Sequence, residues 1–288
     1  MRQYTTSILG TLLIALAPTM AAADQQDPSA NSGKFSLGGN VNYSTGKYGG
    51  SSATDILYVP LSAGYATGQY LFNVTIPYIS VTTSDHAVVP GIGRMSSSTA
   101  MGSSTGGTGM GMGGMGFGSG STTAAGTTTT ESGLGDITAS LGYNFYAGEQ
   151  LGLTVVGGVK LGTADYNKGL GTGKNDYSAE VDSAYAVDDT SFLATLGYRV
   201  VGKPAGFTLN NVAYGSAGIS QKVSDDTRAS LILNGAQSSN AFSASQLAIS
   251  AGWLQQINAT TSWSASLAKG LSSGSPDWGG LLGIFSGF

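Results

Sequence analysis

The chain has 288 residues, of which 10% are charged, 41% are hydrophobic and 46 are glycine, and its formal net charge is −4. A soluble domain usually carries about 25% charged residues, so this composition argues against an ordinary soluble fold and suits a lipid-facing outer wall, although a Gly-rich secreted fibre fits the same numbers. Scattered Lys and Arg in an acidic chain argue against nucleic acid as a partner, and the absence of Cys excludes disulfides and a lipid-anchored cysteine.

The N-terminus has the features of a secretory signal peptide over residues 1–23. Arg2 supplies the positive start, residues 7–17 form a short apolar stretch, and the three alanines at 21–23 offer a cleavage site of small residues. The apolar stretch is shorter than the roughly 20 residues that a membrane-spanning helix needs. We therefore expect export, followed by a short periplasmic segment over residues 24–33.

From residue 34 onward, apolar residues alternate with small or polar ones, as in strands with lipid on one side and a lumen on the other. The alternation is least regular over residues 211–223. Pro60 and Pro77 lie inside two of the strands, where each removes a ladder donor, so they fit only as bulges. The pattern predicts twelve strands: 34–45, 54–66, 69–82, 135–146, 150–162, 176–187, 191–202, 211–223, 227–236, 243–257, 261–271 and 278–288.

Every second connection between these strands is short, and the others are long. The short connections are 67–68, 147–149, 188–190, 224–226 and 258–260, whereas the long ones are 46–53, 83–134, 163–175, 203–210, 237–242 and 272–277. This arrangement predicts an all-β fold over residues 34–288: a transmembrane antiparallel up-and-down β-barrel of about 12 strands with short periplasmic turns and long extracellular loops. The localisation that follows is the outer membrane of a Gram-negative bacterium.

Aromatic residues gather near the short turns, where an interfacial girdle is expected and a soluble β-sandwich would predict no such clustering. They are Tyr65, Tyr70, Tyr143, Phe145, Tyr185, Phe192, Trp253, Trp263 and Phe288. The terminal Phe288 resembles the signal that barrel-assembly machinery recognises, although Ser286 departs from that pattern. The expected partners are therefore outer-membrane lipid, this machinery and a small-molecule permeant of unknown identity.

Four segments at loop–strand junctions carry a recognisable pattern. They are VVPGIG at 88–93, ESGLGD at 131–136, KGLGTGKNDYS at 168–178 and GSPDWGG at 274–280. These segments resemble a family of bacterial outer-membrane barrels named for the meta-pathway of phenol degradation and often labelled transporters. The resemblance implies a barrel that admits aromatic or other small apolar compounds, and it implies no catalytic residue.

Five charged residues are expected on the lumenal faces of neighbouring strands: Asp136, Lys160, Glu180, Asp182 and Arg199. Two assumed pairings set the register, Phe145 with Leu151 and Val187 with Phe192. The first places Asp136 opposite Lys160, and the second places Glu180 opposite Arg199. This charge row predicts either a constriction that selects permeants by polarity or a self-neutralising network that fills part of a narrow barrel. The balance of its signs favours the second interpretation.

The remaining candidates for chemistry are weak. Residues 95–130 form a low-complexity stretch rich in Gly, Ser, Thr and Met. The thioethers of Met suit Cu(I), but the chain has no Cys and His86 is its sole imidazole. A loosely packed external loop is therefore favoured over a copper site. The glycines at 169–173 lack the pattern of a phosphate loop. No nucleophile signature surrounds His86. We therefore expect no enzyme, no cofactor and no metal.

The favoured function is an outer-membrane channel for the passive passage of small molecules, aromatic or apolar ones among them. The alternative is a non-transporting surface barrel with a structural or partner-binding role.

Overall fold

The computed structural model describes residues 33–48, 52–83, 88–89, 93–94, 128–205, 208–239 and 244–288. The expected signal peptide, almost all of the segment 24–33, His86 and most of the stretch 95–130 lie outside the described residues. Within the described ranges, the chain has no helix whose length and apolar character would suffice to cross a membrane.

The described chain forms twelve long wall strands and one short separate pair. The wall strands are β1 (Lys34–Gly46), β2 (Thr54–Thr67), β3 (Tyr70–Thr83), β6 (Thr129–Leu134) with β7 (Thr138–Ala147) as two parts of one strand, β8 (Leu151–Lys160), β9 (Asp176–Val187), β10 (Thr190–Val200), β11 (Val212–Ser224), β12 (Thr227–Ala236), β13 (Gln246–Gln256), β14 (Thr261–Gly270) and β15 (Trp278–Gly287). The separate pair is β4 (Val88–Val89) with β5 (Gly93–Arg94).

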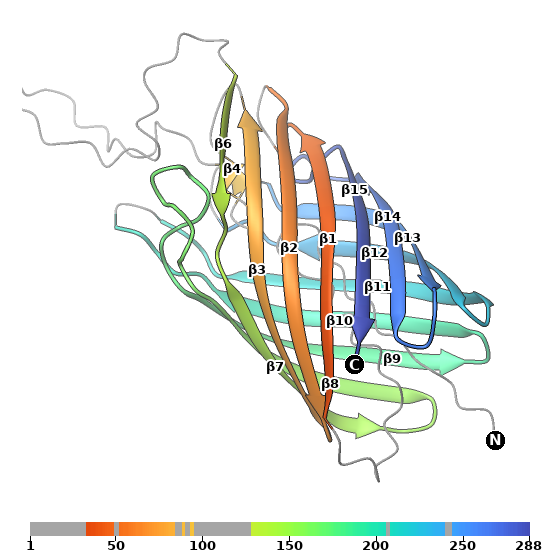
Figure 1. Ribbon diagram of the computed structural model, residues 1–288. Helices are drawn as coiled ribbons and strands as arrows, with labels where there is room; N and C mark the ends of the chain where they lie inside the picture. Colours follow the sequence, from red (N-terminus) through yellow and green to blue (C-terminus); the bar gives the residue numbers. More distant parts are fainter. Residues whose placement is uncertain are drawn as a thin grey trace, which may run out of the picture.

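The wall strands close into a barrel. Each pairs antiparallel with its neighbours, and β1 completes the ring by pairing with β15 from Ser36 opposite Gly287 to Thr45 opposite Trp278. In Figure 1, β1, β2, β3 and β15 stand in front while β9 to β12 cross behind them at a steep angle. Hydrocarbon offers no hydrogen-bond partner to backbone N–H and C=O groups, so only a closed sheet provides a partner for these groups on every strand. The predicted antiparallel barrel of 12 strands is confirmed.

A break in one wall strand sets the position of Asp136. β3 pairs with β7 over Tyr70–Thr75 and with β6 over Tyr78–Thr83, and the Pro77 carbonyl between them accepts a hydrogen bond of 2.8 Å from the Gly135 amide. Pro77 has no N–H that could donate to the ladder, so the opposing strand is interrupted for three residues, 135–137. The predicted strand 135–146 is therefore wrong at its start. It begins at Thr129, and Asp136 lies in the break.

Alternate side chains face lipid and lumen along each strand. On β10, Phe192, Leu196 and Tyr198 are exposed, Leu196 to 74%, whereas Ser191 and Leu193, on either side of Phe192, are buried. Seven of the nine aromatic residues assigned to the girdle are among the exposed hydrophobic side chains.

A second aromatic group, which the sequence analysis missed, lies toward the long-loop ends of the strands. It contains Tyr43, Tyr78, Tyr177, Tyr198 and Trp278, all exposed. On β9, Tyr185 and Tyr177 are eight residues apart, or about 26 Å along a strand. With the tilt of barrel strands, this spacing suits an apolar band bounded by a girdle at each interface.

Candidate functional site

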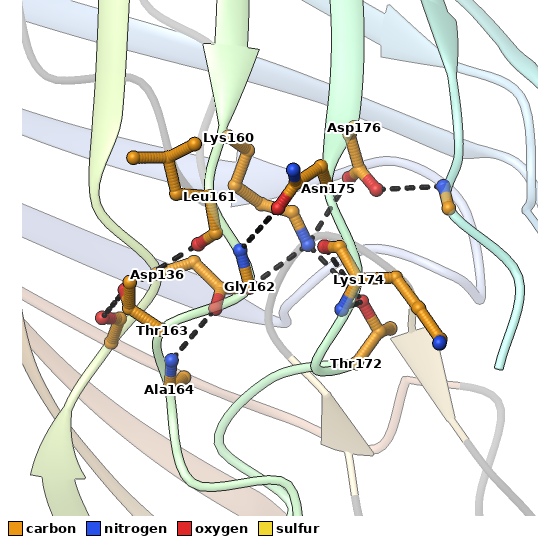
Figure 2. Close-up of polar contacts among 12 residues, drawn as sticks. Asp136, Lys160, Leu161, Gly162, Thr163, Ala164, Thr172, Lys174, Asn175 and Asp176 are labelled. Carbon is orange, nitrogen blue, oxygen red and sulfur yellow. Dashed lines mark hydrogen bonds and ion pairs between the residues drawn. The ribbon is translucent and has the colours of Figure 1, made fainter.

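Lys160 lies between two carboxylates near the long-loop end of the lumen. Its Nζ is 2.9 Å from Oδ2 of Asp136 and 3.2 Å from Oδ2 of Asp176 (Figure 2). The three side chains, which we call the lumenal triad, are 17%, 10% and 4% exposed for Lys160, Asp136 and Asp176. β8 and β9 bring Lys160 directly opposite Asp176, and the break after β6 brings Asp136 to the other side of the ammonium group.

Each member of the lumenal triad also anchors a long loop. Oδ1 of Asp136 accepts a hydrogen bond of 2.9 Å from the Ala164 amide, and Lys160 donates one of 3.3 Å to Oγ1 of Thr172. Both contacts hold the loop 161–175 against the inner wall. Oδ1 of Asp176 accepts a bond of 2.9 Å from the Gly202 amide in the next long loop. With every charge paired and hydrogen-bonded, this half of the charge row has the character of a structural network.

Glu180 and Tyr214 meet deeper in the barrel by reaching across a glycine. Gly197 on β10 pairs with Glu180 on one side and with Tyr214 on the other. A Cβ at Gly197 would overlap the Tyr214 ring, so the missing side chain lets the ring lie over β10. The Tyr214 hydroxyl then donates a hydrogen bond of 2.8 Å to Oε2 of Glu180.

Asp182 belongs to a polar row one step further from the loops. It pairs with Thr195, whose hydroxyl donates a hydrogen bond of 2.6 Å to its Oδ1, and with Thr154 on the other side. Thr154 in turn donates a hydrogen bond of 2.5 Å to Oδ1 of Asn144. The row lines the lumen with hydroxyl, amide and carboxylate groups, which can replace part of the hydration shell of a polar solute.

Arg199 is the cation of the deeper half of the charge row, and its charge acts on Glu180 without a direct ion pair. It pairs in register with Ser178 and Val212, and it forms no salt bridge or hydrogen bond with a described residue. Its guanidinium carbon lies 5.9 Å from the centre of the Tyr214 ring, on the same side of β10 as the glycine that the ring covers. The guanidinium group therefore lies between the Tyr214 ring and the polar rows of Glu180 and Asp182.

The two pairings assumed for the charge row are wrong. Phe145 lies in a bulge between Asn144 and Tyr146, so Lys160 is opposite Thr138, although its side chain still reaches Asp136. Val187 pairs with Thr190 across a two-residue turn in which Asp188 has a φ of 51°. Arg199 therefore lies opposite Ser178 and not opposite Glu180.

Two residues of the site, Asp176 and Tyr214, were not among the sequence predictions. Asp176 shares the inward face of Glu180 and Asp182, because the three alternate along β9, and this parity was visible in the sequence. Tyr214 carried no such signal. Its role depends on the register between β10 and β11, which places Tyr214 opposite Gly197 and which alternation alone does not set.

Comparison with known families and structures agrees with this fold. A family model described as "Putative MetA-pathway of phenol degradation" matches residues 25–286. No curated protein matches the chain.

Two solved structures are similar. An outer-membrane channel from Pseudomonas putida F1 superimposes with a TM-score of 0.62 at 12% identity, covering 91% of this chain and 100% of the other. The NanC porin gives a TM-score of 0.50 at 9% identity, with 86% and 98% of the two chains covered. At these identities the likeness shows the fold that is common to outer-membrane channels.

Lys160→Met is expected to destabilise the folded barrel by about 3–5 kcal/mol, because it leaves two buried carboxylates without a counter-ion. Urea unfolding in phospholipid vesicles, followed by tryptophan fluorescence, measures the loss. Adding Asp136→Asn and Asp176→Asn should restore most of it. Lys222→Met is the matched control, since Lys222 binds Asp225 at 2.7 Å but that carboxylate is 95% exposed, and it should cost at most about 1 kcal/mol. Equal losses in the two single variants would contradict the structural role of the lumenal triad.

Gly197→Val is expected to push the Tyr214 ring from its place and break its bond to Glu180, at a cost of about 1–3 kcal/mol for the overpacking. Gly157→Val serves as the control, because nothing lies within 4 Å of a Cβ added at Gly157. The same unfolding measurement should leave this control within about 0.5 kcal/mol of the parent chain. If Gly197→Val has the same unfolding free energy as the parent chain, the position of the Tyr214 ring does not depend on Gly197.

Proposed function

The chain belongs to the family of the meta-pathway of phenol degradation, and from this membership we propose that it is an outer-membrane channel for the passive passage of small molecules. Permeants would diffuse down their gradient through the lumen. The long loops would narrow the entrance. The deeper half of the charge row, which consists of Glu180, Asp182 and Arg199, would filter solutes by polarity. No catalytic step is part of this proposal.

The deeper half of the charge row, formed by Glu180, Asp182 and the cation Arg199, is the observation that carries the proposal. These three charges contact hydroxyl groups and the Tyr214 ring and form no direct ion pair within the described chain, whereas a purely structural network would pair its partly buried charges. A solute passing the polar rows of Glu180 and Asp182 would meet that cation together with two carboxylates. Such a mixed lining suits small neutral or polar molecules better than ions of either sign.

The class of permeant that we propose includes small aromatic and apolar molecules. The family description supports this class. So does the inner wall near the long loops, where a cluster of buried apolar side chains contains Ile56, Tyr58 and Ile79. A permeant with both a ring and a polar group would find a matching surface in each half of the lumen.

We also propose export through the signal peptide 1–23 and assembly through Phe288. The side chain of Phe288 is 73% exposed on the lipid face, where another protein can reach it. Its backbone N–H donates a hydrogen bond of 2.8 Å to the carbonyl of Phe35, next to the start of β1. The residue proposed as the recognition signal thus lies at the seam where the barrel closes.

Osmotic swelling of liposomes that contain the purified protein tests the channel. Liposomes should swell in isotonic solutions of small sugars and amino acids, and the rate should fall as the solute becomes larger. Protein-free liposomes provide the baseline. Swelling no faster than this baseline for every solute would reject the channel and favour the surface barrel.

Arg199→Ala is expected to make the channel more selective for cations. In a water-filled lumen, a unit charge about 8 Å from a passing ion contributes roughly 0.5 kcal/mol, which is about a twofold change in the permeability ratio. The reversal potential across a planar bilayer in a KCl gradient measures this ratio. Lys203→Ala removes the same charge from an exposed loop nearby and should leave the ratio unchanged. An unchanged ratio in Arg199→Ala would show that the charge row is not a filter.

A further inference from the structure

Two charged residues on the wall strands of the described chain alternate onto the lipid face, Asp55 of β2 and Lys269 of β14. Lys269 lies along the chain between Leu267 and Leu271, whose side chains are 69% and 53% exposed. Asp55 precedes Ile56, which is buried and faces inward. Lys269 is thus the one cation that the described wall strands present to lipid.

The two outward charges belong to one row that crosses the seam where the barrel closes. Asp55 lies opposite Thr45 of β1. Thr45 lies opposite Trp278 of β15, which in turn lies opposite Lys269. We call these four residues the seam row. Since neighbouring strands are about 4.8 Å apart, the backbones at its two ends are about 14 Å apart. Asp55 has a partner of its own, because its Oδ1 accepts a hydrogen bond of 2.9 Å from the Tyr43 hydroxyl.

Trp278 sets the depth of the seam row in the membrane. Its side chain is 57% exposed and belongs to the aromatic group near the long-loop ends, where an interfacial girdle is expected. The headgroups of the leaflet on the long-loop side lie at this depth, and a lysine there costs much less free energy than at the bilayer centre. The ammonium group of Lys269 therefore lies among headgroups and above the acyl chains.

The ammonium group of Lys269 has an aromatic partner but no carboxylate. Its Nζ lies 4.4 Å from the centre of the Trp278 ring, a cation–π contact that holds the group over the indole. It forms no salt bridge with a carboxylate of the described chain. The nearby Asp277 alternates to the inner face, where its charge acts on the buried Tyr48. Since an ammonium group has three N–H donors, donors remain for an anion.

We propose that Lys269 and Trp278 form a binding site on the outer wall for the phosphate group of an anionic membrane lipid. The phosphate would accept hydrogen bonds from the ammonium group, and the exposed side chains of Leu267 and Leu282 would contact the acyl chains. Asp55 would repel a phosphate at the other end of the seam row, which restricts the lipid to the Lys269 end. The site lies outside the lumen, so it does not depend on the proposed channel.

Quenching of tryptophan fluorescence by brominated lipids tests the site in the folded protein. The chain has three Trp residues, so Trp253→Phe combined with Trp263→Phe leaves Trp278 as the only indole. In mixed vesicles of phosphatidylglycerol and phosphatidylcholine, quenching by brominated phosphatidylglycerol should show about fivefold enrichment of this lipid at Trp278, because one lysine near the surface attracts anionic lipid by about that factor. Brominated phosphatidylcholine gives the reference. Equal quenching by the two lipids at equal mole fractions would overturn the site.

Variants of Lys269 in the same single-tryptophan chain test the charge. Lys269→Met should abolish the enrichment, whereas Lys269→Arg should retain it, because a guanidinium group also binds phosphate. Enrichment that persists in Lys269→Met, or that is lost in Lys269→Arg, would contradict the proposal.

Trp263 provides the matched control within the same strand. It faces lipid in the girdle at the short-turn end of β14, where the described wall strands present no cation to lipid. A chain in which Trp253→Phe and Trp278→Phe leave Trp263 as the only indole should be quenched equally by the two brominated lipids. A preference for phosphatidylglycerol as large as that at Trp278 would show that the whole wall attracts anionic lipid and would overturn the site.

Discussion

The whole structure depends on the pairing of the first strand with the last. Backbone N–H and C=O groups that face hydrocarbon have no water to bind, so each must find a partner in the next strand. The pairing of β1 with β15 supplies the final set of partners over ten residue pairs. Once the ring is closed, the faces of all other strands are fixed, and every second side chain has to face inward into a confined space.

That confined space explains the way in which the inner charges are held. Inward-facing side chains of neighbouring strands share a narrow lumen, so they contact one another across the ladder more than they would on an open sheet. Glycine is used where a long side chain has to cross a strand, as Tyr214 does over Gly197. Inward-facing carboxylates are held in two ways. In the lumenal triad they form ion pairs with Lys160, whereas Glu180 accepts a hydrogen bond from the neutral hydroxyl of Tyr214.

Much of the fold was predictable because side chains of a barrel strand face lipid and lumen alternately, and this period of two appears in the sequence as alternation of apolar with small or polar residues. The start of β6 was not, because Pro77 acts on the opposing strand through a hydrogen bond that no local pattern records. The neighbours of the inner charges were harder still. One bulge at Phe145 and one two-residue turn at Asp188 shift the partners of Lys160 and Arg199, and neither can be read from alternation. The five charges were found, but the contacts among them needed the register.

The seam between β1 and β15 has a consequence for folding. Since these are the first and last wall strands of the described chain, the ladder between them joins the two wall strands that are furthest apart in sequence. A chain without β15 would leave β1 and β14 as open edges, whose backbone groups find no partner in hydrocarbon. Contacts of such long range are the slow ones to form, so closure of the ring is expected to come late in folding.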